Sequence, residues 1–193
     1  MSLSLYDTTV AVFIRQLKNL SAVLKKQQNE ALTPTSQAEK WCDDNQKPHS
    51  ELLEARLAPD MYPLTSQIRL AVRWARNGAL LNKDYHFMAT DGKPELKHTF
   101  AELQGLIQDA LDFLQSVEAE DIEGAEKKPV SVWSSGEEGK GHNVKLNSGH
   151  TLLTQAIFPN FWFHDAAAYN ICRMKGVPLG KMDFLMGAGP FDD

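Results

Sequence analysis

The stretch Asn147–Pro178, NSGHTLLTQAIFPNFWFHDAAAYNICRMKGVP, is the most informative about how this chain folds. It predicts one long helix, which Asn147 or Ser148 caps and which runs to about Lys175. Gly176 stands where glycine is favoured just after a helix, and Pro178 prevents the helix from continuing. One face carries residues spaced by three or four, and we expect it to lie in the core. That face consists of Leu153, Ile157, Asn160, His164, Ala167 and Ile171.

Three earlier segments each predict a helix with one apolar face. The first is capped by Ser4 and ends at Thr33-Pro34, and the second is capped by Asp60 with Pro63 in its first turn. The third begins with a capping box in which Thr99 and Glu102 satisfy each other's backbone amides. The polar stretch 35–48 is interpreted as a surface excursion, 51–56 as a short helical piece, and 82–97 as a loop. The apolar face of the first helix consists of Tyr6, Val10, Phe13, Leu17, Leu20 and Leu24. That of the second consists of Leu64, Ile68, Ala71, Ala75 and Ala79, and that of the third of Phe100, Leu103, Ile107, Ala110, Leu114 and Val117.

Between the third and fourth helices the apolar period changes to two. Val130 and Val132 alternate with Ser131 and Trp133, and Val144 and Leu146 alternate with Lys145. A glycine-rich turn lies between the two stretches, which predicts a β-hairpin. Four amphipathic helices can bury their faces around one core, so the fold class is all-α, a four-helix bundle with a small β-hairpin. No linker divides the chain, and residues 1–193 are expected to form a single domain with the tail from Leu179 docked along the bundle.

Composition narrows the classes of function. A hydrophobic content of 42% with 23% charged residues is typical of a globular protein, and the net charge of −5 argues against nucleic acid as a partner. The first twenty residues are interrupted by Asp7, Arg15 and Lys18, so neither a signal peptide nor a membrane span is indicated. Cys42 and Cys172 are far apart and fit free thiols. We therefore expect a cytoplasmic protein that does not associate with membranes.

His164 is the candidate catalytic residue. It lies on the predicted core face with Asn160 one turn before it, and a histidine and an asparagine in a core need partners or a wet pocket. Either His164 is buried with one hydrogen bond, or it binds a ligand or exchanges protons with one. The other histidines do not complete a site with it, because His150 would lie about 21 Å away along the helix.

A second polar cluster precedes helix two. Arg56 and Asp60 flank an apolar turn, and the guanidinium of Arg56 could receive an anionic group. Asp60 could equally be a plain helix cap. Tyr169 could supply a hydroxyl to the same cavity, although an aromatic residue at helical spacing often belongs to the core. The candidate ligand-binding residues are thus Arg56, Asp60, Asn160 and Tyr169.

Four motifs together resemble a bacterial family of unknown function. They are Ser4-Leu5-Tyr6-Asp7, Arg56-Leu57-Ala58-Pro59-Asp60-Met61, Pro159-Asn160-Phe161-Trp162-Phe163-His164 and Gly176-Val177-Pro178-Leu179-Gly180-Lys181-Met182-Asp183-Phe184. The family is assigned to the DinB/YfiT-like superfamily, whose members are regarded as metalloenzymes. The resemblance implies a four-helix bundle, often dimeric, and either a divalent metal held by three histidines or a thiol-dependent transferase or isomerase.

The sequence departs from that superfamily at the metal ligands. A second histidine one turn from His164 would stand at Asn160 or Ala168, and neither is one. The core-facing positions of helix two, where the other ligand is expected, carry Gln67, Ile68, Ala71, Trp74 and Ala75. We therefore expect the three-histidine site to be missing and predict no metal-ligating residue, which leaves the cofactor unknown.

Two hypotheses follow from the sequence. In the first, a small molecule, with an anion among the candidates, binds in a pocket around His164, where acid–base chemistry would use the imidazole. In the second, the protein is not an enzyme, and the aromatic helix four with the apolar tail forms a homodimer or partner face. A homodimer is the expected assembly, and a monomer with a polar cavity would count against the second hypothesis.

Overall fold

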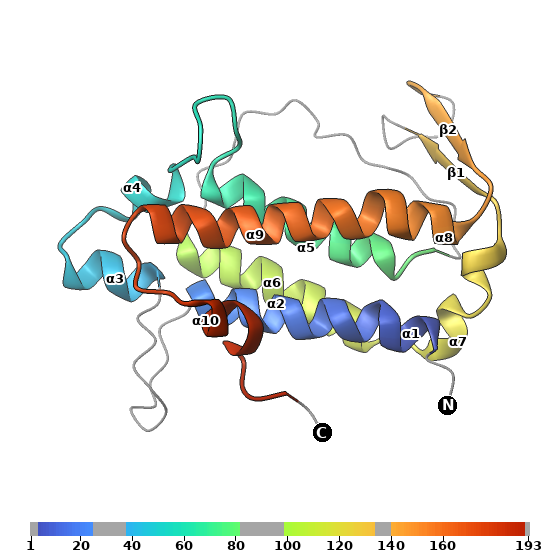
Figure 1. The fold of residues 1–193 in the computed structure, drawn as a ribbon, viewed down its shortest axis with the longest axis horizontal. Coiled ribbons are helices and arrows are strands. Elements are labelled where there is room, and N and C mark those ends of the chain that lie inside the picture. The colour runs from blue at the N-terminus through green and yellow to red at the C-terminus, as the bar shows by residue number, and fades with distance from the viewer. Residues whose placement is uncertain (1–3, 25–37, 82–98, 134–139, 192–193) are drawn as a thin grey trace.

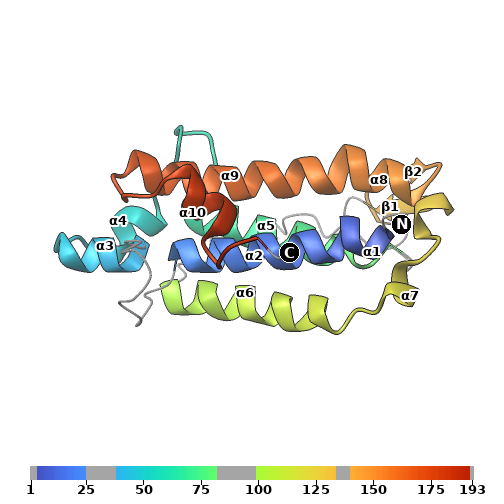
Figure 2. The same cartoon turned by 60° about the horizontal axis from the view of Figure 1, so that its bottom comes forward.

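Four long helices build the protein and run side by side along its length (Figure 1). The computed structural model describes residues 4–24, 38–81, 99–133 and 140–191. The long helices are α2 (Val10–Leu24), α5 (Leu64–Gly78), α6 (Phe100–Gln115) and α9 (Phe158–Met174). α5 packs along α9, and α6 packs against both α2 and α5 (Figure 2). Together with the hairpin described below, this confirms the predicted fold class.

The apolar faces predicted from the sequence form the core. Phe13, Leu17, Ile68, Leu103 and Ile107 are all fully enclosed. Among the described residues, no helix combines the length and apolar character needed to cross a lipid bilayer.

Short helices precede and separate the long ones. α1 (Leu5–Thr8) starts with Ser4, whose hydroxyl accepts from the Asp7 amide at 3.0 Å, as expected for the cap. The chain leaves helical geometry at Thr9 before α2 begins, so the predicted first helix is in fact two. Its predicted end at Thr33 lies outside the described residues. The polar stretch expected to be a plain surface excursion contains α3 (Ala38–Asp44), which buries Ala38 and Cys42 one turn apart.

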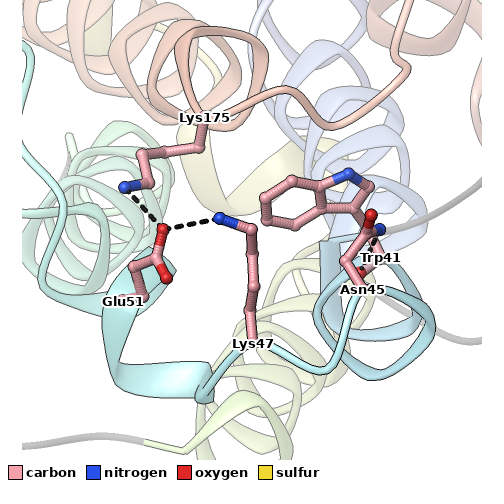
Figure 3. A network of polar contacts seen from close by, with 5 residues as sticks. All are labelled: Trp41, Asn45, Lys47, Glu51 and Lys175. Atoms are coloured by element: carbon pink, nitrogen blue, oxygen red, sulfur yellow. Dashed lines mark hydrogen bonds and ion pairs between the residues drawn. The ribbon is translucent and has the colours of Figure 1, made fainter.

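Charged side chains link α3 and α4 (His49–Leu53) to the C-terminal end of α9. One oxygen of Glu51 accepts from Lys47 at 2.9 Å and from Lys175 at 3.0 Å (Figure 3). Lys47 also lies over the ring of Trp41, 5.2 Å from its centre. The hydrogen bond from Lys47, followed by that from Lys175, lowers the pKa of Glu51, so the carboxylate stays charged. This network holds the α3–α4 segment against the C-terminal end of α9.

Helix two begins later than predicted. α5 starts at Leu64 after Pro63, whose backbone is extended, and Asp60 is an exposed residue of the preceding turn and not the cap. Arg56 donates from Nη1 to the Met61 carbonyl at 2.6 Å, and the Met61 amide donates to the Ala58 carbonyl. These bonds hold the segment as a turn and delay the helix. The start of α6 is as predicted, because Thr99 and Glu102 form the capping box.

The hairpin joins the third and fourth long helices. After α7 (Ala119–Ile122) and the 3-10 turn η1 (Ala125–Lys127), β1 (Val130–Trp133) pairs antiparallel with β2 (Asn143–Leu146), with Val130 opposite Leu146. Val130 and Val132 face the interior. The expected alternation is therefore confirmed on β1, whereas Val144 of β2 is exposed.

The last helix contains one turn of a wider kind. Ser148 caps α8 (Gly149–Leu152), and η2 (Leu153–Ile157) is π-helical, with the Phe158 amide bonded to the carbonyl of Leu153. Pro159 has no amide hydrogen to donate within a regular helix, which favours such a local rearrangement. The chain then continues into α9, turns at Gly176 and forms α10 (Lys181–Met186) against α2.

Candidate functional site

His164 and Gln67 form the centre of the candidate site. His164 lies on α9 and is 8% exposed, and its Nδ1 is 2.7 Å from Oε1 of Gln67 on α5. Gln67 itself is buried, and its Nε2 donates to the Tyr62 carbonyl at 3.1 Å. The core position predicted for His164 is thus confirmed. Its partner comes from the helix that packs along α9.

The contacts of Gln67 determine which nitrogen of His164 carries the proton. A backbone carbonyl only accepts, so the amide nitrogen of Gln67 must face Tyr62 and its oxygen must face the imidazole. Nδ1 of His164 therefore donates, and Nε2 of the neutral ring keeps its lone pair. Nε2 has no hydrogen-bond partner among the described residues, and it is not among their fully enclosed unpaired polar atoms.

Burial also keeps the imidazole uncharged. Loss of water lowers the pKa of His164 to about 4, because the charged ring is the form that burial disfavours. The ring of the neighbouring Phe163 stands edge-on to the imidazole with centroids 5.2 Å apart. At neutral pH, His164 presents a neutral nitrogen that accepts hydrogen bonds next to an aromatic ring.

Asp165 is a buried carboxyl that sequence reasoning missed. It is only 1% exposed, and its Oδ2 accepts from Nε2 of Gln16 on α2 at 2.7 Å. Burial raises the pKa of Asp165 to about 7, and the hydrogen bond from Gln16 lowers it in part. A signal existed in the sequence, because Phe161, Asp165, Ala168 and Cys172 are spaced by four, three and four. They form a second buried face of the helix.

The four predicted ligand-binding residues lie apart from one another. Arg56 and Asp60 are exposed in the turn before α5. Asn160 is half-buried and donates to the Ala156 carbonyl of its own helix at 2.7 Å. Tyr169 is half-buried against the ring of Phe184, with centroids 5.4 Å apart. No hydrogen bond within the described part of the chain joins any of them to His164, and their role as ligand contacts stays a prediction.

The described residues around His164 do not supply the three ligands of a histidine-bound metal. The Nδ1–H···Oε1 bond to Gln67 leaves the Nε2 lone pair of His164 able to serve as one ligand, but Gln67 supplies an amide where a second histidine ligand would be needed. Within residues 4–24, 38–81, 99–133 and 140–191, no three His, Cys, Asp or Glu side chains are grouped to hold a metal ion. His49 instead pairs with Asp43 at 2.9 Å. His86 and His98 lie outside the described residues.

The two cysteines are buried and not bonded to each other, in agreement with the expected free thiols. Burial raises the pKa of Cys172 to about 12 and also raises that of Cys42. Because the thiolate is the reactive form, burial disfavours reaction of both thiols near neutral pH.

Comparison with known proteins places this arrangement in a family. Residues 5–185 match the family described as "Domain of unknown function (DUF1993)". The crystal structure of a DinB family member protein from Shewanella denitrificans is similar over 98% of this chain and 95% of that one, with 29% sequence identity and a TM-score of 0.73. No curated protein matches. The chain therefore belongs to the DUF1993 family and has a DinB-like fold.

Proposed function

We propose that the protein binds a small molecule at His164, and that Nε2 of the imidazole accepts a hydrogen bond from it. The observation that carries this proposal is the contact between Nδ1 of His164 and Oε1 of Gln67. That contact fixes the ring orientation and leaves a basic nitrogen without a partner among the described residues. A purely structural histidine would gain little from a second, unsatisfied nitrogen.

The protonation state selects the ligand chemistry. A neutral imidazole with its hydrogen on Nδ1 offers only an acceptor at Nε2, so the complementary group is a hydroxyl, thiol or amine hydrogen. An anion finds no positive charge at this ring, since a group with a pKa of about 4 is protonated in only about one molecule in a thousand at pH 7. We therefore favour a neutral hydrogen-bond donor over the anionic ligand considered from the sequence.

The same pKa defines how much chemistry His164 can do. A general base works best with a pKa near the working pH, and a group near 4 is a weak base. Binding is thus the primary role, and proton transfer from a bound hydroxyl or thiol would require the ligand to raise the pKa of His164. A thiol-dependent transferase is compatible with this site. A metal-dependent one would need ligands that the described residues around His164 do not supply.

Ligand-observed NMR with two probe series tests the proposal. The donor series is 2-mercaptoethanol and cysteine methyl ester, and the anionic series is acetate and succinate. We expect the donor probes to bind the wild-type chain and a His150→Gln control, whose histidine is exposed on α8. Binding should be lost in His164→Ala, and the carboxylates should not bind. Equal binding of the donor probes to wild type and to a folded His164→Ala variant would refute the proposal.

A homodimer through α9 is a second candidate function. Phe163 and Met174 are 55% and 51% exposed, and eleven residues of helix place them about three turns apart on one side of α9. Exposed apolar side chains aligned on one helix are typical of an interaction surface. Sedimentation equilibrium of wild type and of a Phe163→Ser, Met174→Ser variant distinguishes the cases. A wild-type monomer at all concentrations would rule this candidate out.

A further inference from the structure

The C-terminal segment is held by side chains that recognise its backbone. Gln16 donates to the Phe184 carbonyl at 3.3 Å, and Asn19 donates to the Leu185 carbonyl at 2.9 Å. Asn19 also accepts from the Ala188 amide at 3.0 Å. Arg15 donates to the carbonyls of Gly189 and Pro190 at 2.6 and 2.8 Å. Arg15, Gln16 and Asn19 therefore form a row of side chains on α2 that hydrogen-bonds to the main chain of residues 184–190.

The amides of this row are fully satisfied only when the segment is docked. The two amide hydrogens of Gln16 go to Asp165 and to the Phe184 carbonyl, and its oxygen accepts from Asn19 at 3.3 Å. Asn19 uses both hydrogens and its oxygen in the same network. Gln16, Asn19 and Asp165 are all buried. In this structure the Phe184 and Leu185 carbonyls and the Ala188 amide complete the network.

The segment itself contributes little to the core. No residue of α10 is fully buried, in contrast to every long helix of the bundle. Its main side-chain anchor is the half-buried Phe184, whose ring lies 5.4 Å from that of Tyr169 and 6.4 Å from that of Trp162. A Cβ added at Gly187 would lie 2.5 Å from the Asp183 carbonyl oxygen and 3.3 Å from Cβ of Ala22 on α2, so glycine allows the tight turn and the close approach to α2. Few buried apolar contacts mean a low free energy of local opening.

Figure 2 shows α10 crossing between α9 and α2 at the surface of the bundle. We propose that Arg15, Gln16 and Asn19 of α2, together with Asp165 of α9, form a peptide-binding groove whose occupant, the chain's own residues 181–190, is removable. The groove selects a peptide backbone with an aromatic side chain at the position of Phe184. The same segment supplied by another molecule fits it equally well, because the hydrogen bonds described above between this segment and α2 are all to its main chain. This groove is independent of the ligand proposed for His164.

A synthetic peptide of residues 181–193, labelled with fluorescein, tests the groove with full-length chains. In wild type the attached segment competes, so anisotropy should show weak binding. In Phe184→Ala the attached segment is loosened, and we expect the peptide to bind at least tenfold more tightly than to wild type. Hydrogen exchange at the Ala188 amide should rise tenfold in the same variant, since Asn19 is the partner of that amide. A scrambled peptide should not bind.

Substitutions in the groove, made in the Phe184→Ala background, should weaken binding of the peptide. Gln16→Leu with Asn19→Leu removes the contacts to the segment, and peptide binding should be lost. Asn19→Asp keeps the acceptor for Ala188 but loses the donor to Leu185, so it should weaken binding even if the double variant does not fold. Lys18→Ala, an exposed neighbour on α2, is the matched control and should bind like its parent. Unchanged peptide affinity in Phe184→Ala, or tight binding to Asn19→Asp, would overturn the proposal.

Discussion

His164 and Asp165 are consecutive residues of α9, yet each is held by a glutamine from a different helix. Gln67 of α5 lies 2.7 Å from Nδ1 of His164, and Gln16 of α2 lies 2.7 Å from Oδ2 of Asp165. Burial lowers the pKa of His164 to about 4 and raises that of Asp165 to about 7. Between these two values both side chains are largely uncharged. The centre of α9 therefore carries no net charge over the mildly acidic range.

Replacing Gln67 with glutamate should raise the pKa of His164. A carboxylate in place of the amide oxygen stabilises the imidazolium, so the pKa should move from about 4 toward or above the ordinary value of 6.5. The Cε1–Hε1 resonance of His164, followed by NMR from pH 3 to 9, measures the change. An unchanged pKa of His164 in the variant would contradict the assigned contact.

Replacing Asp165 with asparagine should change how stability depends on pH. The folded-state pKa of about 7 lies above the ordinary 3.8, so between these values only the folded state keeps the proton, and rising pH destabilises the wild type through this group. The asparagine side chain cannot ionise, so the Asp165→Asn variant should gain most over wild type at pH 8 and little at pH 4. Urea unfolding at several pH values measures this. Asp109→Asn, at an exposed position on α6, is the control.

Replacing His164 with glutamine should remove a contribution to the free energy of unfolding whose pH dependence is opposite to that of Asp165. The folded-state pKa of about 4 lies below the ordinary 6.5, so between these values only the unfolded state binds the proton, and rising pH stabilises the wild type through this group. In wild type the slopes from His164 and Asp165 oppose each other between pH 4 and 6.5. The free energy of unfolding of His164→Gln should instead fall with pH over that range. If the free energy of unfolding of the wild type changed with pH in parallel with that of the variant, burial would not shift the pKa of His164.

A divalent metal site should be recoverable with two substitutions. Gln67→His places an imidazole from α5 within reach of His164, and Asn160→His adds a third one turn earlier on α9. The double variant should bind one Zn²⁺ or Ni²⁺ per chain by calorimetry, at least a hundredfold more tightly than wild type. Gln67→His alone should bind more weakly. If the double variant bound no better than wild type, these three positions would not converge.

Replacing either of two glycines with alanine should change the stability of the fold, in opposite directions at the two positions. A Cβ at Gly149 would lie 2.3 Å from the Ala125 carbonyl oxygen, so Gly149→Ala should cost about 1–3 kcal/mol through forced movement of η1. Gly105 is exposed within α6 with nothing within 4 Å of such a Cβ, so Gly105→Ala should stabilise by about 0.5–1 kcal/mol. Thermal unfolding measures both. Similar shifts in the two variants would contradict this difference.

Much of the fold was predictable because its signals are local. The capping box at Thr99 and the cap at Ser148 depend only on residues three positions apart, and the apolar faces depend only on helical spacing. The start of α5 was predicted too early, because a hydrogen bond from Arg56 to the Met61 carbonyl holds the preceding segment as a turn. Asp60 lies in that turn, where its place in the sequence resembles that of a helix cap. That bond could not be inferred from a spacing rule.

The candidate site was predictable only in part. His164 was identified because it lies on the main apolar face of its helix. Asp165 was missed because one buried face was assumed, whereas α9 meets α5 on one side and the Gln16–Asn19 row on another. Gln67 was recognised as facing the core, but its pairing with His164 depends on how α5 and α9 are aligned. Such alignment is a property of the packed bundle.

The π-helical turn Leu153–Ile157 determines where the chain could gain or lose a residue. A wide turn holds one residue more than an α-helical turn, so deleting the exposed Thr154 would convert it into a regular turn and leave His164 opposite Gln67. Deleting a residue between Phe158 and Phe163 would instead rotate the rest of α9 by about 100°. That rotation would separate both glutamines from their partners. A one-residue deletion is therefore tolerated within Leu153–Ile157 and excluded just after Phe158.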